Sequence, residues 1–323
     1  MSGLLVVRPS SLGDVVHALA LVADVNAQRP DLPIDWVAEE AFVPLVQMDA
    51  RIRTVVPLAL RRWRFGLLAA STRAEFTGFR NALRAQHYNV ILDLQEQVKG
   101  ALVARLARGR RHGLDRQSIR EPLATFFDDV HHRIARDQHF IDKCRALAAA
   151  ALGYEVTGPP RWKFSPPPPG AAMPGGPYAL AFHATSRDDK LWPEDHWRGL
   201  LAHFAQAGFT TLLPWGSPVE EARSRRLAAD APAAVVPPRL SLPELASLAR
   251  NAEVVVGVDT GLTHLAAAIG TPTVAMFTAT DAALAGVARA GAHARDVGGN
   301  GHVPSLADAI AVIGRVLRDA SRC

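Results

Sequence analysis

The sequence has 323 residues, of which 49% are hydrophobic, and its 36 Lys and Arg against 31 Asp and Glu give a formal net charge of +5. A chain of this length exceeds what one hydrophobic core organises, so we predict two domains of roughly 150 residues each. No apolar run approaches the roughly 18 residues of a membrane-spanning helix, and no basic segment followed by an apolar core opens the chain. We therefore expect a soluble cytoplasmic protein.

The charge is uneven along the chain. Residues 1–160 hold 21 Lys and Arg against 17 Asp and Glu, whereas residues 161–323 hold 15 against 14. The first half is therefore expected to meet an acidic partner such as anionic lipid or acidic sugar. Nucleic acid is disfavoured, because aromatic residues make up only 7% and do not alternate with the arginines. The two cysteines, Cys144 and Cys323, form neither a metal-binding pair nor a disulfide framework.

Apolar runs alternate with helical patterns through the first half. Strands are predicted at residues 4–7, 34–37 and 90–94, as in a parallel sheet with helices on both faces. The stretch FSPPPPGAAMPGGP, residues 164–177, then breaks all periodicity and predicts a linker.

The same alternation resumes after the linker. Strands are predicted at residues 178–182, 210–213, 253–258 and 273–277. The expected fold is thus α/β, with two doubly wound, Rossmann-like domains at residues 1–163 and 178–323. Because open α/β sheets bind ligands at the carboxyl ends of their strands, we expect the two domains to face each other across a ligand-binding cleft.

The first strand is followed by RPSSLGDVVHALAL, residues 8–21, which reads as strand, tight turn and helix. Asp14 lies where this helix begins. Ser10, Ser11 and Asp14 are all good helix-start residues, so a capping role remains open beside a catalytic one. The turn has a single glycine, Gly13, and matches neither G-x-G-x-x-G nor a P-loop, which disfavours a nicotinamide dehydrogenase.

Two loops of the second domain suggest a diphosphate site. In VVVGVDTGLTHLAAAIGTPTV, residues 254–274, a strand ends at Asp259, and Thr260 and Gly261 form a turn before a helix whose dipole favours an anion. An ordinary turn capped by Asp259 and Thr260 is the alternative. AFHATSRDDKLWPEDHW, residues 181–197, adds hydroxyls and Lys190, which alone would be a surface lysine.

Several segments occur in the same order as the motifs of a known family. SSLGDVVHALAL, ALRRWR, SIREPLA, HATSRDDKLWPEDHW, LPWGSPVEE and VDTGLTHLAAA resemble motifs of the type I lipopolysaccharide heptosyltransferases, a family of ADP-heptose glycosyltransferases, across nearly the whole chain. The resemblance implies the glycosyltransferase B fold and ADP-heptose as the donor. It also implies inverting transfer of L-glycero-D-manno-heptose to the Kdo sugar of Kdo-lipid A, in synthesis of the lipopolysaccharide inner core.

The resemblance also assigns roles to individual residues. It makes Asp14 the catalytic base and places Asp259 and His264 near the donor sugar, although His264 could equally be a structural histidine. Glu220 would meet the adenosine ribose. The donor diphosphate would be held by Thr185, Ser186, Lys190, Thr260 and Gly261.

The acceptor side is assigned to arginines. Arg120 and the arginine triplet, which is Arg61, Arg62 and Arg64, match positions that face the acidic acceptor. The triplet could otherwise be a solvated charged surface. It is flanked by apolar residues that suit a membrane-embedded acceptor: Leu58, Leu60, Trp63, Phe65, Leu67 and Leu68.

Two departures from the family pattern stand out. Ser186 replaces a frequent threonine, which is conservative, and FTATD at residues 277–281 replaces a more usual glycine-proline loop, which leaves the local donor contact open.

The expected enzyme is metal-independent, because Lys190 and backbone N–H groups can neutralise the leaving diphosphate and no metal-ligand cluster is recognisable. We expect a monomer that contacts the cytoplasmic face of the inner membrane of a Gram-negative bacterium peripherally and binds no nucleic acid. Two other classes compete: a non-catalytic protein that binds a nucleotide sugar or acidic glycan, and an oxidoreductase.

Overall fold

The chain divides into two compact units, each with its own sheet. In the computed structural model, residues 3–66, 69–168, 170 and 173–320 are described. Unit 1 is Met1–Ser165 and unit 2 is Pro166–Cys323. Leu67, Leu68, Cys323 and linker residues 169, 171 and 172 lie outside the described residues.

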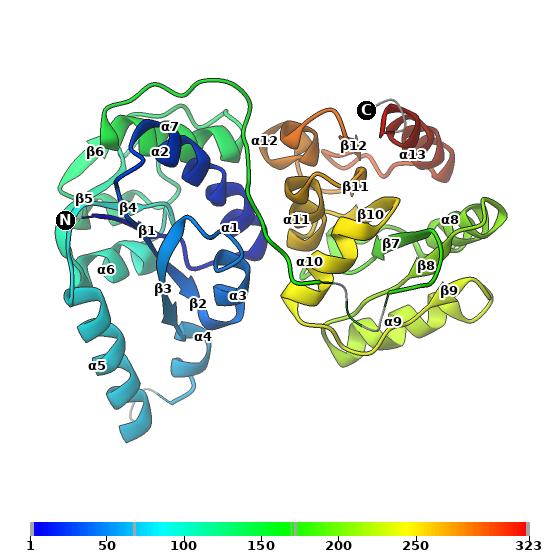
Figure 1. The fold of residues 1–323 in the computed structure, drawn as a ribbon, viewed down its shortest axis with the longest axis horizontal. Coiled ribbons are helices and arrows are strands. Elements are labelled where there is room, and N and C mark those ends of the chain that lie inside the picture. Colours follow the sequence, from blue (N-terminus) through cyan, green and yellow to red (C-terminus); the bar gives the residue numbers. More distant parts are fainter. Residues whose placement is uncertain (1–2, 67–68, 169, 171–172, 321–323) are drawn as a thin grey trace. The chain divides into compact units, whose positions relative to one another are not determined.

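Unit 1 is built on a six-stranded parallel sheet (Figure 1). In spatial order its strands are β3 (Ile52–Leu58), β2 (Ile34–Glu39), β1 (Gly3–Val7), β4 (His87–Asp93), β5 (Arg108–Leu114) and β6 (Val130–His132). The helices are α1 (Leu12–Leu19), α2 (Leu21–Gln28), α3 (Val43–Val46), α4 (Leu60–Trp63), α5 (Ala70–Arg84), α6 (Val98–Leu106) and α7 (Phe140–Leu152), with 3₁₀ turns η1 (Glu40–Phe42) and η2 (Pro122–Phe127). The central strand β1 is wholly buried, as expected for an apolar parallel strand.

Unit 2 repeats this architecture. In spatial order its strands are β12 (Ala294–Gly298), β11 (Thr273–Phe277), β10 (Val254–Val258), β7 (Tyr178–Phe182), β8 (Thr210–Leu212) and β9 (Ala234–Val235). The helices are α8 (Glu194–Gln206), α9 (Pro218–Ala228), α10 (Leu242–Asn251), α11 (Gly261–Ile269), α12 (Ala282–Ala285) and α13 (Leu306–Ala320), with 3₁₀ turns η3 (Asp188–Lys190) and η4 (Val287–Ala290). The expectation of two doubly wound α/β domains is confirmed.

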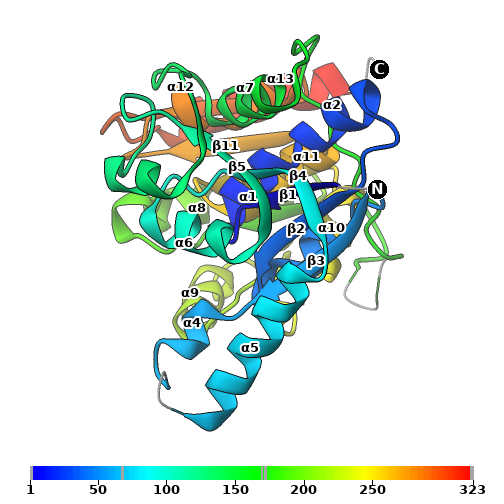
Figure 2. The same ribbon diagram turned by 90° about the vertical axis from the view of Figure 1, so that its left-hand side faces the viewer.

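The packing of Phe164 and Ser165 marks where unit 1 ends. Phe164 is buried and the Ser165 N–H donates to the Met48 carbonyl at 2.9 Å, so the chain stays packed on unit 1 through Ser165. Elsewhere in unit 1, the Trp63 ring of α4 packs edge-on against Phe76 and Phe79 of α5. Helix α5 projects beyond the sheet of its unit in both ribbon views (Figure 2).

The close packing of α11 on its sheet depends on one glycine. A Cβ on Gly257 of β10 would lie 2.1 Å from Oγ1 of Thr263, so only glycine allows this approach. The Thr263 hydroxyl in turn donates to the Val258 carbonyl at 2.8 Å. Because the strands are parallel, the carboxyl ends of β7, β10 and β11 lie at one edge of the sheet, beside the start of α11.

Candidate functional site

Asp14 lies in the first turn of α1, directly after β1. Its Oδ2 accepts hydrogen bonds from the Ser11 N–H at 2.9 Å and the Ser11 hydroxyl at 2.8 Å, and it pairs with the Arg8 guanidinium at 2.7 Å. The contact with the Ser11 N–H is one half of a capping box, so the capping reading of Asp14 describes part of its role. Its side chain is 37% exposed, however, and no described residue bonds to Oδ1. That oxygen is available to a substrate.

Arg8 holds Asp14 in its ionised form. The Arg8 side chain is 5% exposed, also donates to the Leu94 carbonyl, and has its guanidinium 4.7 Å from the centre of the Phe140 ring. Burial would raise the pKa of Asp14, but the charge of Arg8 and the hydrogen bonds from Ser11 outweigh it, so the pKa lies below its ordinary value. A carboxylate at this point is the form that can accept a proton.

Two other carboxyl groups in unit 1, those of Asp93 and Asp128, have raised rather than lowered pKa values. Burial, and then the charge of Asp128, raise the pKa of Asp93 to about 8, and burial raises the pKa of Asp128 to about 6. Asp93 is 2% exposed and is the last residue of the neighbouring strand β4. Because burial favours the neutral form of Asp93 while Arg8 and Ser11 favour the ionised form of Asp14, Asp14 is the better base of the two.

The arginine triplet lies on and just after α4 and is exposed. Arg62 pairs with Glu40 at 3.2 Å and with Glu75 at 2.8 Å, so part of its charge is neutralised within unit 1. The guanidinium groups of Arg61 and Arg64 lie over aromatic rings, those of Phe42 and Phe65, at 5.3 and 4.5 Å from the ring centres.

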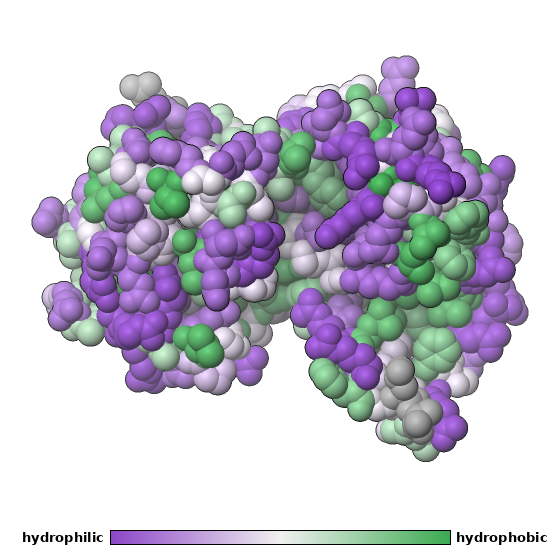
Figure 3. Space-filling view, turned by 180° about the vertical axis from the view of Figure 1, so that it is seen from behind, coloured by the Kyte–Doolittle hydropathy of each residue, from purple (hydrophilic) through white to green (hydrophobic). Residues whose placement is uncertain are grey.

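The remaining predicted acceptor residue, Arg120, is exposed in the segment before η2. Within the described part of the chain, no hydrogen bond or ion pair links Arg120 or the arginine triplet to Asp14. Among the described residues, the predicted acceptor residues are therefore not bonded to the predicted base. Phe65 beside the triplet is 80% exposed, and on the face drawn in Figure 3 hydrophobic residues cover a broader area of unit 1 than of unit 2.

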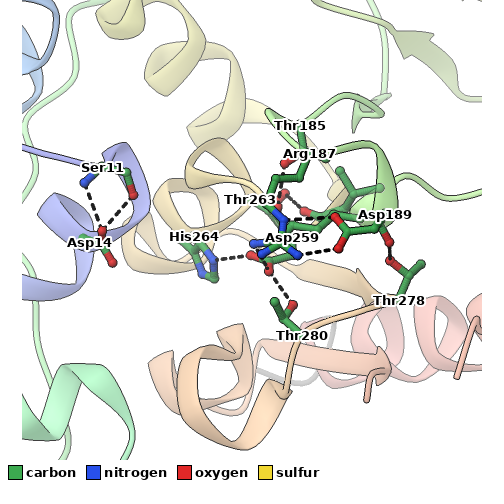
Figure 4. Close-up of polar contacts among 12 residues, drawn as sticks. Ser11, Asp14, Thr185, Arg187, Asp189, Asp259, Thr263, His264, Thr278 and Thr280 are labelled. Carbon is green, nitrogen blue, oxygen red and sulfur yellow. Dashed lines mark hydrogen bonds and ion pairs between the residues drawn. The ribbon is translucent and has the colours of Figure 1, made fainter. Parts of the chain in front are cut away.

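In unit 2, the two predicted donor loops meet at Asp259 (Figure 4). The Lys190 ammonium in η3 pairs with Oδ2 of Asp259 at 2.7 Å, and the Thr185 hydroxyl donates to the Asp259 carbonyl at 3.1 Å. His264 Nε2 lies 3.3 Å from the other oxygen, Oδ1. Residues 69 positions apart in the chain thus form one cluster, as the sequence predicts, and they do so because β7 and β10 are neighbours in the sheet.

Asp259 is the centre of this cluster. Burial would raise its pKa, but contacts with His264, Lys190 and the Thr280 hydroxyl, at 2.5 Å, hold it below the ordinary value. Thr260 is the N-cap residue of α11, but its side chain makes no capping hydrogen bond. Among the described residues, the N–H groups of Gly261 and Leu262 at the start of α11 have no hydrogen-bond partner, although that of Thr263 donates to the Thr260 carbonyl. Together with the Lys190 ammonium, these N–H groups form a potential anion-binding site.

The other predicted donor residues lie around this cluster. Gly261 is the first residue of α11, and Ser186 is exposed in the loop after β7. Glu220 is on α9, where its Oε2 accepts the Gly216 N–H at 2.7 Å, so it is positioned by the loop after β8 and shares no hydrogen bond with Asp259 or Lys190 among the described residues.

Sequence reasoning missed three contributors. Arg8 is a buried cation at the end of an apolar strand, which is an unusual place for a charge and was a usable signal. Thr278 and Thr280 lie in the FTATD loop, where only the departure from the family pattern marked them. Among the described residues, no group of three or more His, Cys, Asp and Glu side chains could hold a metal ion, and no helix has the length and apolar character needed to cross a bilayer.

Comparisons with known proteins identify the family of the chain. The family model "Glycosyltransferase family 9 (heptosyltransferase)" matches residues 76–300. The lipopolysaccharide heptosyltransferase 1 of Escherichia coli K12 is 42% identical over 294 residues, which is 87% of this chain and 89% of that protein. The corresponding Pseudomonas aeruginosa protein is 37% identical over 289 residues, 87% of this chain and 80% of that one.

Solved structures show the same similarity over the full length. E. coli heptosyltransferase WaaC with ADP superposes with a TM-score of 0.86 at 36% identity, covering 100% of this chain and 99% of the other. The WaaC structure with ADP-2-deoxy-2-fluoro heptose gives a TM-score of 0.81 at the same identity and coverage.

Proposed function

Because the chain belongs to glycosyltransferase family 9, the heptosyltransferases, we propose that it transfers L-glycero-D-manno-heptose from ADP-heptose to the Kdo of Kdo-lipid A in synthesis of the lipopolysaccharide inner core. The observation that carries the proposal is the Lys190 and Asp259 pair at the start of α11, an anion site with an acidic neighbour for sugar hydroxyls. The structures of the similar E. coli WaaC, one with ADP and one with ADP-2-deoxy-2-fluoro heptose, support the choice of donor.

The chemistry is a direct displacement with inversion. The acceptor hydroxyl gives its proton to the Asp14 carboxylate as its oxygen bonds to the anomeric carbon of heptose. The bond from that carbon to the β-phosphate oxygen breaks at the same time, and ADP leaves with the electron pair. Asp14 suits this role because Arg8 and Ser11 keep it ionised while Oδ1 stays accessible.

Unit 2 stabilises the leaving ADP. The charge that develops on the diphosphate is met by the Lys190 ammonium, the hydroxyls of Thr185 and Ser186, and the N–H groups at the start of α11, which begins at Gly261. Asp259 and His264 bind the heptose hydroxyls, and Glu220 binds the adenosine ribose. We include metal-independence in the proposal, since these groups supply the positive charge at the diphosphate, and expect chelators to leave the rate unchanged.

The acceptor is held by unit 1. Arg61, Arg64 and Arg120 are exposed and fit the carboxylate of Kdo and the phosphates of lipid A. Phe65 adds an exposed apolar side chain beside the triplet, which suits peripheral contact with the cytoplasmic face of the inner membrane. The similarity to named heptosyltransferases outweighs the alternatives of a non-catalytic binding protein and an oxidoreductase.

Release of ADP tests the proposal. Purified protein is incubated with ADP-heptose and Kdo-lipid A, and ADP is measured with either substrate omitted as the control. We expect ADP release that requires both substrates and persists in EDTA. Folded protein that releases no ADP with both present would contradict the proposed function, and a rate abolished by EDTA and restored by a divalent cation would contradict metal-independence.

A further inference from the structure

The loop that carries Lys190 is tied to the rest of unit 2 at both ends. At its start, the Thr185 hydroxyl donates to the Asp259 carbonyl at 3.1 Å. At its end, the indole N–H of the fully buried Trp192 donates to the Pro304 carbonyl at 2.9 Å. Between these ties, η3 presents the Lys190 ammonium to Asp259.

A third tie lies next to Lys190 itself. The Thr278 hydroxyl donates to the Asp189 carbonyl at 2.6 Å, joining the end of β11 to η3 across 89 positions of sequence (Figure 4). Thr278 is 4% exposed. Its own carbonyl accepts the Gly301 N–H at 2.8 Å, and the carbonyl of Thr280 accepts the Asn300 N–H at 3.1 Å. The hydroxyl is therefore presented by a backbone segment that is fixed at two points.

We propose that Thr278 is a positioning residue for donor binding. Its hydrogen bond holds η3 so that the Lys190 ammonium stays beside the diphosphate-binding site at the start of α11. This inference rests on the proposed function.

The hydrogen bond between Thr278 and Asp189 matters because a lysine on a mobile loop loses conformational freedom when it binds a phosphate, and this loss weakens binding. The ammonium has three N–H donors and a flexible stem, and Asp259 takes one of these donors. A bound diphosphate competes with Asp259 for Lys190, so the ion pair is a poor anchor during catalysis. The hydrogen bond from the Thr278 hydroxyl goes to a backbone carbonyl, for which bound ADP-heptose does not compete. It can therefore keep the loop ordered before the substrate binds.

Three variants test this, with ADP binding measured by calorimetry and KM measured for each substrate. Thr278→Val keeps the shape but removes the hydroxyl, and should weaken ADP binding and raise the KM for ADP-heptose on the order of fivefold, the net effect of one hydrogen bond. The KM for Kdo-lipid A should not change. Thr278→Ser keeps the hydroxyl and should bind ADP nearly as the native protein does.

Thr211→Val is the matched control. Thr211 is 1% exposed on β8, and its hydroxyl has no partner among the described residues, so this variant should leave ADP binding unchanged. Thermal unfolding of each variant is recorded in parallel. Should Thr278→Val fail to fold, Thr278→Ala, which also lacks the hydroxyl, replaces it.

A double-mutant cycle with Lys190→Ala separates positioning from a general structural effect. If Thr278 acts through Lys190, its substitution should change ADP affinity little in the Lys190→Ala background. An equal loss in both backgrounds would overturn the inference, as would native affinity in Thr278→Val. Failure of the native protein to bind ADP would instead overturn the proposed function, so the two failures are distinguishable.

Discussion

Replacing Asp14 by asparagine separates a catalytic base from a helix cap. An asparagine oxygen can still accept the hydrogen bonds from the Ser11 N–H and hydroxyl that Asp14 accepts at 2.9 and 2.8 Å. What the variant loses is the negative charge. We therefore expect a folded protein whose transfer rate falls at least about 100-fold, the lower range for loss of a general base.

The stability cost can be bounded from the surroundings of Arg8. Breaking a fully buried ion pair costs roughly 3–5 kcal/mol, but the Asp14 side chain is 37% exposed, and Arg8 keeps the Leu94 carbonyl and the Phe140 ring. We expect a loss of about 1–2 kcal/mol in the free energy of unfolding. Domains are typically stable by roughly 5–15 kcal/mol, so the variant remains folded at assay temperature.

Ser11→Ala provides the comparison. It removes the hydroxyl contact to Asp14 at a cost of about 1 kcal/mol, yet leaves the carboxylate in place. Urea unfolding and ADP release are measured for both variants. A catalytic Asp14 predicts similar stability losses but a far larger rate loss for Asp14→Asn. If Asp14→Asn keeps its activity within about tenfold of Ser11→Ala, the general-base argument is wrong.

Three further predictions follow from the same site. Lys190→Ala should raise the KM for ADP-heptose about 10-fold or more, because a charge-assisted contact to the diphosphate is lost, while the KM for Kdo-lipid A stays the same. A selective acceptor defect in titrations of each substrate would contradict the assignment of Lys190 to the donor. Replacing the arginine triplet by glutamine should raise the acceptor KM and reduce binding to anionic vesicles at low salt, while donor affinity stays unchanged. Arg62→Gln alone should have a smaller effect, because Arg62 pairs with two glutamates. If acceptor use and vesicle binding both survive the triple substitution, the triplet is ordinary surface charge. Arg8→Met removes the charge that lowers the pKa of Asp14, so this pKa should rise. Asp14 then becomes protonated at higher pH, and the acidic limb of the kcat/KM profile should move to higher pH. An unmoved acidic limb would show that Asp14 does not control it.

The central strands of both sheets could be predicted from the sequence because burial on both faces makes them continuously apolar. β1, β7 and β10 are fully buried along their lengths. The strands that escaped prediction lie toward the edges. β5 begins with Arg108 and carries two more arginines, and β3 is exposed at several positions, so neither has the apolar run that identifies a strand.

The site shows the same division between local and long-range information. Asp14 and Lys190 could be singled out as candidates because each follows a predicted strand, at the point where parallel sheets present their ligand-binding residues. The contacts of Arg8 with Leu94 and of Thr278 with Asp189 depend on which strands become neighbours. Strand order is a property of the whole sheet, so the local sequence could mark Arg8 and the FTATD loop as unusual but could not predict these two contacts.

The most direct test of the account is the structure of the product. Kdo-lipid A is treated with the protein and ADP-heptose, and the product is examined by mass spectrometry and by NMR of the new anomeric centre. We predict a gain of one heptose on Kdo, with an anomeric configuration opposite to that in the donor. An unmodified acceptor, or a heptose that retains the donor configuration, would contradict direct displacement assisted by Asp14.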